Sequence, residues 1–145
     1  MTNATALSFG FPATQIAETA SWRVLVRPKQ PTFGALVLIC KDEAKAFSDI
    51  SAVAFADLQV AIKGVEATLK RVVNYQKVNY LMLMMVDPDV HFHVIPRYEG
   101  VRTYEGVTFA DAGWPGPPAL GEAVDLGQDG AARLAEVLRA AWPNS

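Results

Sequence analysis

A single long apolar stripe between runs of strand-forming residues most constrains how this chain can fold. Its members recur at alternating steps of three and four, which places them on one face of a helix. They are Phe55, Leu58, Ile62, Val65, Leu69 and Val72. Ser51 stands where a helix N-cap is expected, and Gly64 predicts a close approach of the helix to a sheet. A helix with one apolar face must pack on another layer, so the pattern predicts a helix laid on a sheet.

Short runs rich in β-branched and aromatic residues predict about five strands. Three precede the helix and two follow it. In order they are TQIAET, residues 23–27 (RVLVR), ALVLICK, residues 78–86 (VNYLMLMMV) and residues 89–98 (DVHFHVIPRY). The connector PKQPTFG predicts a turn between the second and third strands, and Asp87-Pro88 predicts a tight hairpin between the last two.

The remaining chain completes one domain that spans residues 1–145. Residues 99–127 are rich in Gly and Pro, notably in GWPGPP, and predict a surface loop. A closing helix is expected over about residues 129–141, before Pro143. The predicted fold class is therefore α+β, an antiparallel sheet of about five strands with a long helix and a C-terminal helix.

Composition and charge exclude several classes of protein. The net charge is −2 and no Lys/Arg-rich run occurs, which argues against nucleic acid or an anionic membrane as a partner. The longest apolar runs, such as YLMLMMV, are far shorter than a membrane helix, and the N-terminus lacks a signal-peptide pattern. Cys40 is the single cysteine, so neither an internal disulfide nor a cysteine-based metal cage is expected. We therefore expect a cytoplasmic protein.

Both histidines of the chain lie in the last predicted strand, two positions apart. Side chains at i and i+2 of a strand share a face, so His91 and His93 point the same way, with Asp89 before them on that face. A buried imidazole needs hydrogen-bond partners, which makes two of them beside a carboxylate unusual in a core. This strand is the candidate chemical site.

Three interpretations of the pair remain open. A neutral imidazole is a good nucleophile towards phosphorus, and Asp89 and His93 would orient His91 for attack. Alternatively, His-x-His supplies two metal ligands on one face, with Asp87 or Asp89 adding an oxygen, although the chain has no third histidine. The third interpretation is two hydrogen-bonded histidines without chemistry.

The segment DVHFHVIPRY resembles the signature of the histidine-triad (HIT) superfamily, His-φ-His-φ-His-φ-φ (φ apolar), which Pro-Arg follows in many members. The order of elements from about residue 16 to residue 98 agrees with that family as well. The sequence is most similar to a bacterial branch in which the first motif histidine is replaced and a Trp-Pro element follows, here Trp114-Pro115.

The resemblance implies an activity and a site. Members of the superfamily are nucleotide hydrolases or nucleotidyl transferases that attack an α-phosphate and pass through a covalent nucleotidyl-histidine, without a metal cofactor for that step. They usually form homodimers whose sheets join. By position, His91 corresponds to the nucleophile, and His93 corresponds to a residue that hydrogen-bonds the reacting phosphate. A small-molecule nucleotide is the implied substrate.

The chain departs from the family pattern at three places. Asp89 replaces the first motif histidine, and only Asp87-Pro88 stands where many members carry a loop that holds phosphates. Arg27 occupies a position that is polar in many members. Arg27, Arg97 and Trp114 are candidate nucleotide contacts. Because of these departures, a second function remains open, nucleotide binding by a degenerate family member without turnover. A metal protein that uses the His-x-His pair is the third alternative.

Overall fold

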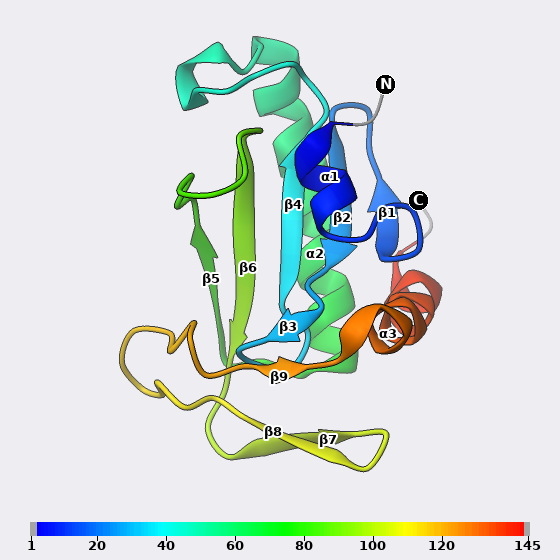
Figure 1. The fold of residues 1–145 in the computed structure, drawn as a ribbon, viewed down its shortest axis with the longest axis vertical. Coiled ribbons are helices and arrows are strands. Elements are labelled where there is room, and N and C mark those ends of the chain that lie inside the picture. Colours follow the sequence, from blue (N-terminus) through cyan, green and yellow to red (C-terminus); the bar gives the residue numbers. More distant parts are fainter. Residues whose placement is uncertain (1–2, 144–145) are drawn as a thin grey trace.

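The computed structural model describes residues 3–143, which form a five-stranded antiparallel sheet with helices on both of its faces (Figure 1). The strand order is β1-β2-β4-β6-β5. The strands are β1 (Gln15–Glu18), β2 (Trp22–Val26), β4 (Leu36–Cys40), β6 (His91–Arg97) and β5 (Lys77–Leu81). The predicted α+β class and the sheet of five strands are confirmed.

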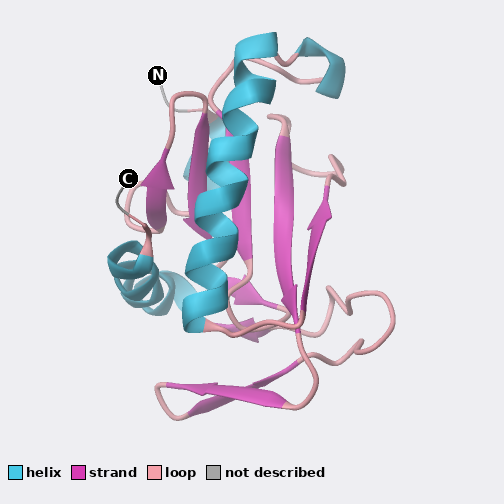
Figure 2. Cartoon of the chain, turned by 180° about the vertical axis from the view of Figure 1, so that it is seen from behind, coloured by secondary structure: helices cyan, strands magenta, loops and turns pink. Residues whose placement is uncertain are grey.

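The long helix α2 (Ala52–Val72) crosses one face of this sheet (Figure 2). Ser51 is its N-cap, as predicted, and its side chain accepts a hydrogen bond from the Ala54 N–H at 3.1 Å. Several residues of the buried face are small (Ala54, Ala61 and Gly64), which lets the helix approach closely; Val65, Thr68 and Leu69 complete that face. Phe55, which the stripe placed in the core, is therefore 44% exposed.

The opposite face of the sheet carries the short helix α1 (Ala4–Ser8), which the sequence did not reveal. Ala6 of α1 packs on Leu25, Val37 and Ile39 in a small second apolar cluster. The C-terminal helix α3 (Gly127–Ala141) begins two residues before the predicted start and packs beside β1 and α2. The fold thus has a thick core under α2 and a thinner layer under α1.

The predicted tight hairpin at Asp87-Pro88 is wrong. Strand β5 ends at Leu81, and residues 82–90 form a longer loop before β6. At the end of this loop the main chain of Val90 already bonds to residues near β4: its N–H donates to the Ala44 carbonyl, and its carbonyl accepts from the Cys40 N–H. In the loop, Met82 and Met84 pack against the core, whereas Leu83, Met85 and Val86 are exposed.

The Gly/Pro-rich segment also contains more structure than predicted. Strands β7 (Val101–Tyr104) and β8 (Val107–Ala110) form a hairpin, and β9 (Val124–Asp125) pairs with β3 (Lys29–Gln30). The hairpin turns through Glu105 and Gly106, which both have positive φ, as a type I′ turn requires. A 3-10 turn (Phe47–Asp49) precedes α2.

Gly64 permits a close approach, but its neighbour is Trp142 rather than the sheet. A Cβ atom at position 64 would overlap the Trp142 ring, which follows the last turn of α3. The glycine thus lets the end of the chain lie against α2.

We predict that Gly64→Ala destabilises the protein by about 1–3 kcal/mol, because overpacking outweighs the gain of about 1 kcal/mol in helix propensity. Urea unfolding measures the change. In a Trp142→Leu background the overlap is relieved, so the same Gly64→Ala change should become neutral or stabilising. An equal loss in both backgrounds would contradict this packing.

Candidate active site

The two histidines lie on β6 and face α1, with His91 opposite Ile39 and His93 opposite Val37 on β4. Their ring centroids are 5.1 Å apart in an edge-to-face arrangement. The Phe9 ring, just after α1, lies 6.4 Å from the His91 ring and 6.1 Å from the His93 ring. The strand alternation predicted from the sequence therefore brings both imidazoles to one site.

A main-chain hydrogen bond fixes the tautomer of His91. Its Nδ1 lies 2.7 Å from the carbonyl oxygen of Asp89. A carbonyl oxygen only accepts, so Nδ1 must carry the proton, and in the neutral ring the lone pair is on Nε2. No hydrogen bond to Nε2 is found within residues 3–143. The side chain is 2% exposed, so the ring is held in a fixed orientation by its surroundings.

The Asp89 carboxylate does not perform the orienting role expected of it. One oxygen accepts from the Thr5 N–H at 3.1 Å and the Thr5 hydroxyl at 2.9 Å, and the other accepts from Lys45. Burial would raise the pKa of Asp89, but the hydrogen bonds from Lys45 and Thr5 hold it below its usual value. Asp89 lies two residues before the start of β6. Its carboxylate therefore holds α1 through Thr5, whereas its carbonyl bonds to Nδ1 of His91.

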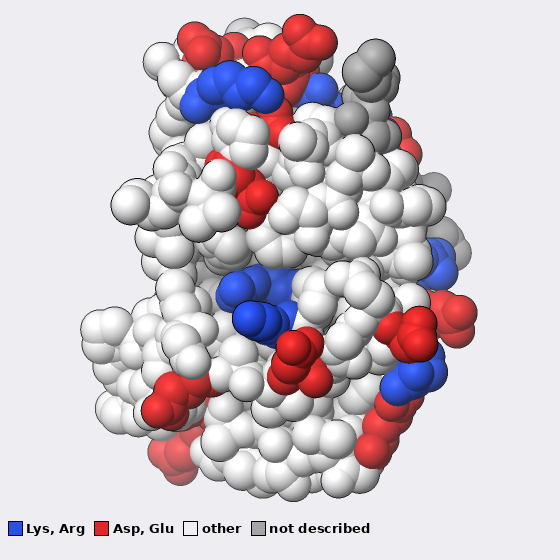
Figure 3. Space-filling view, viewed as in Figure 1, with Lys and Arg blue, Asp and Glu red and all other residues white. Residues whose placement is uncertain are grey.

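The histidines open onto a cavity of about 340 Å³. Its polar lining consists of Arg27, Asp87, His91 and His93, and its apolar lining consists of Phe9, Leu83, Met85, Val86 and Leu120. A second cavity of about 380 Å³ adjoins it, because Phe9 and Arg27 line both; Pro28, Lys29, Asp125 and Gln128 also line the second. Figure 3 shows Lys and Arg atoms set into a hollow near the middle of this face, just above β3 and β9.

Arg27 brings an unpaired cation to the boundary of the two cavities. Its Nε and Nη1 atoms are buried and have no hydrogen-bond partner among the described residues, and burial lowers the pKa of its guanidinium. Gln30 holds the main chain on both sides of it in place. Its Nε2 donates to the Arg27 carbonyl at 2.7 Å, and its Oε1 accepts from the Gly34 N–H at 2.7 Å. A partly buried guanidinium with two nitrogens that lack partners is costly, so an anion in this cavity would be favoured.

His93 is a neutral neighbour of this cation. Burial, followed by the electrostatic effects of Arg27 and of the neighbouring His91 ring, lowers its pKa from 6.5 to about 4, while Asp87 opposes the shift. Its Nδ1 is buried without a partner in the part of the chain that the structure describes. The ring therefore holds an unsatisfied polar atom at the cavity and is uncharged near neutral pH.

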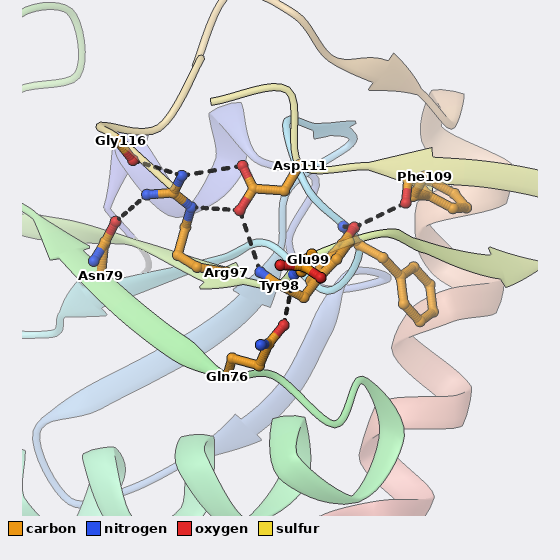
Figure 4. A network of polar contacts seen from close by, with 9 residues as sticks. Gln76, Asn79, Arg97, Tyr98, Glu99, Phe109, Asp111 and Gly116 are labelled. Carbon is orange, nitrogen blue, oxygen red and sulfur yellow. Dashed lines mark hydrogen bonds and ion pairs between the residues drawn. The ribbon is translucent and has the colours of Figure 1, made fainter. Parts of the chain in front are cut away.

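Arg97 and Trp114 lie away from the histidines, contrary to their expected role in the same site. Arg97 is 4% exposed and pairs with Asp111 (Nε to Oδ2, 2.7 Å; Nη2 to Oδ1, 3.1 Å). It also donates to Asn79 and to the Gly116 carbonyl, as Figure 4 shows. Trp114 lines a separate cavity beside Asn79 and Lys77. Four of the five guanidinium N–H groups are thus occupied: three hold the 111–116 segment to β6, and the fourth donates to Asn79 on β5.

Sequence reasoning missed Phe9, Gln30 and the loop residues that line the site. The five-residue helix before Phe9 has too few residues for a periodic signal. Gln30 stands in a connector that was assigned only to a turn. The apolar run of residues 82–86 was assigned to a strand because its composition favours one.

Two further findings concern metals and membranes. Within residues 3–143, no group of three or more His, Cys, Asp or Glu side chains is arranged to hold a metal ion. No helix in that same range combines the length and apolar character needed to cross a membrane.

Comparisons with solved structures agree with this architecture. A histidine triad protein from Bradyrhizobium japonicum is 20% identical, with a TM-score of 0.72 over 99% of this chain and 98% of that one. A second, from Sinorhizobium meliloti, has the same identity and TM-score over 97% and 96%. The diadenosine triphosphate hydrolase of Plasmodium falciparum is 12% identical, with a TM-score of 0.64 over 89% and 76%. At these identities the likeness establishes the fold.

A search of curated proteins found no match. The family model of the HIT domain, in contrast, matches residues 12–100, which are more than half of the chain and include β6 with both histidines. The chain therefore belongs to the HIT domain family.

Proposed function

We propose that this chain is a nucleotide hydrolase or nucleotidyl transferase in which His91 attacks the α-phosphate of a small nucleotide. Proteins of the HIT family generally bind nucleotides or act as nucleotide hydrolases and transferases. The observation that carries the proposal is the 2.7 Å contact of His91 Nδ1 with the Asp89 carbonyl, which leaves the Nε2 lone pair free in a ring that lines the cavity.

The reaction proceeds by two displacements. In the first, the Nε2 lone pair forms a bond to the α-phosphorus, while the bond to the leaving group breaks and its electron pair departs with that group. In the second, a water oxygen bonds to phosphorus, the N–P bond breaks with its electrons returning to Nε2, and the proton of water passes to solvent. An alcohol in place of water makes the reaction a transfer. The Asp89 carbonyl stabilises the positive ring formed between the steps.

Arg27 and His93 would hold the phosphate. The unpaired nitrogens of Arg27 offer charge-assisted hydrogen bonds to a phosphate oxygen, and neutral His93 adds a further polar contact. The adjoining cavity, between Phe9 and Pro28, would take the nucleoside. Arg97 has no part in this proposal because its nitrogens bond to Asp111, Asn79 and Gly116.

A second function, nucleotide binding without turnover, is favoured by one observation. The loop 82–90 supplies no cationic or hydrogen-bond-donating side chain, and it places the Asp87 carboxylate in the cavity lining. A phosphate chain leaving on that side would be repelled. A protein that holds a nucleotide monophosphate through Arg27 would not need such donors.

The quaternary structure and the compartment are also proposals. β5 is an outer strand of the sheet, so a second copy could extend the sheet there into the homodimer that the family resemblance implies. Analytical ultracentrifugation gives the oligomeric state. The cytoplasm is the proposed compartment.

We predict that the protein acquires label on His91 when it is incubated with adenosine phosphoramidate carrying a radioactive α-phosphate, because its leaving group is not a phosphate chain. Quenching in alkali preserves the acid-labile N–P bond. His91→Ala should remove the label completely, because the nucleophile is gone, whereas His93→Ala should slow labelling without abolishing it. Circular dichroism controls for folding, and persistent label in a folded His91→Ala protein would contradict the assignment.

We predict that NMR titration gives His93 a pKa of about 4 and that Arg27→Gln raises it, because one of the neighbouring positive charges is removed. Lys29→Gln, at a residue that lines the adjoining cavity but not the histidine cavity, is the charge-matched control and should have little effect. Between about pH 6.5 and 4 His93 binds a proton in the unfolded chain but not in the folded one. The free energy of unfolding should therefore decrease as the pH falls through this window. An unshifted pKa near 6.5 would contradict this environment.

Isothermal titration with AMP and GMP separates the two functions. A binder without turnover should show saturable affinity that Arg27→Gln weakens and His91→Ala largely spares, with no label in the preceding experiment. An enzyme should show both label and affinity.

A further inference from the structure

We propose that residues 82–90 make the leaving-group side of the histidine cavity selective for an apolar, uncharged leaving group and against a phosphate chain. The inference rests on the proposed function and names the substrate class of that same site, a nucleoside monophosphate esterified to an apolar, uncharged group such as an aryl group. The residues that determine this selectivity are Met85, Val86 and Asp87.

The two sides of the cavity have opposite character. Arg27 stands at the end of β2, on the boundary with the adjoining cavity, and is the one Lys or Arg among the residues that line the histidine cavity within the described chain. The loop between β5 and β6 contributes Leu83, Met85, Val86 and Asp87, and Leu120 adds a further apolar side chain. The nucleotide phosphate therefore has a counter-ion on one side only.

The loop displays its apolar side chains because its alternate residues are anchored. Met82 and Met84 pack against the main core, and Met84 adopts a positive φ of 53°. Leu83, Met85 and Val86 are left 45%, 85% and 90% exposed. Exposed apolar groups gathered on the wall of a cavity with a chemical site are best explained by an apolar group of the ligand that covers them.

Charge gives the loop its selectivity. Its ionisable side chains are Asp87 and Asp89, and the Asp89 carboxylate already pairs with Thr5 and Lys45. Asp87 is left in the lining of the histidine cavity. A leaving phosphate chain would bring further negative charges toward this carboxylate, and the loop offers no cation to offset them. The repulsion raises the free energy of the transition state in which a phosphate chain departs.

The step remains balanced with the favoured substrate. His91 Nε2 bonds to the α-phosphorus, the P–O bond to an aryl group breaks, and the aryl oxygen departs with its electron pair and takes a proton from solvent. Water then releases the nucleoside monophosphate as described above. The apolar ring of the leaving group stays against Met85 and Val86 until it diffuses away.

Two AMP esters of similar chemical reactivity test the proposal. One carries 4-nitrophenol, and the other carries 3-carboxy-4-nitrophenol, which adds a carboxylate to the leaving group; release of the phenol is followed by absorbance. We expect kcat/KM to be about tenfold higher for the 4-nitrophenyl ester, whose aryl group carries no charge, than for the carboxylated ester. Asp87→Lys should shrink or reverse that preference and should speed any turnover of diadenosine triphosphate.

Glu43→Lys is the matched control, because it makes the same charge change at an exposed residue that does not line the histidine cavity. It should leave the preference unchanged. The double variant Met85→Ser, Val86→Ser should lower kcat/KM for the 4-nitrophenyl ester more than for the carboxylated ester. Nearly equal rates for the two esters, or a preference that Asp87→Lys does not alter, would overturn the inference while leaving His91 as the nucleophile. If neither ester is turned over and His91 takes no label, the proposed function fails and the inference fails with it.

Discussion

The buried carboxylate of Asp89 is the contact on which the rest of the site depends. It satisfies the Thr5 N–H in the first turn of α1 and the Thr5 hydroxyl, and it pairs with Lys45. The same residue turns its carbonyl to His91 Nδ1. One residue thus attaches the N-terminal helix to the sheet, which brings Phe9 against both imidazoles, and fixes which nitrogen of His91 carries the proton.

The second constraint is a cation without a partner. Elsewhere in the molecule buried charges are paired: Arg97 with Asp111 and Asp89 with Lys45. Arg27 keeps Nε and Nη1 buried beside the histidines with no partner among the residues that the structure describes, and a folded protein tolerates such a group where a ligand completes it. Its charge also helps to keep His93 neutral. The electrostatics of the site therefore favour an anion on the Arg27 side, while Asp87 and the apolar loop disfavour one on the opposite side.

Local sequence patterns were enough to predict the strand that carries both histidines and the long helix behind the sheet. Strand alternation placed His91 and His93 on one face, and the apolar stripe with Ser51 gave the long helix and its cap. The HIT domain match agrees with the family suggested by DVHFHVIPRY. Such features depend on periodicity over a few neighbouring residues, which the sequence displays directly. The contacts of Arg97 and Asp89 could not be predicted in this way, because each residue forms them with a residue distant in the chain, Asp111 and Thr5.

The sequence by itself thus determined the fold class, the order of the main elements and the pairing of the two imidazoles. Only the tertiary structure decided that the Asp89 carbonyl, not its carboxylate, orients His91, and that residues 82–90 form a wall of the cavity instead of a hairpin. It also decided that Nε and Nη1 of Arg27 have no hydrogen-bond partner within residues 3–143. The physical reason is that the hydrogen-bond partner of a buried polar group depends on the whole fold. A polar group takes whichever partner the fold brings within reach, and that partner is often far away in the sequence.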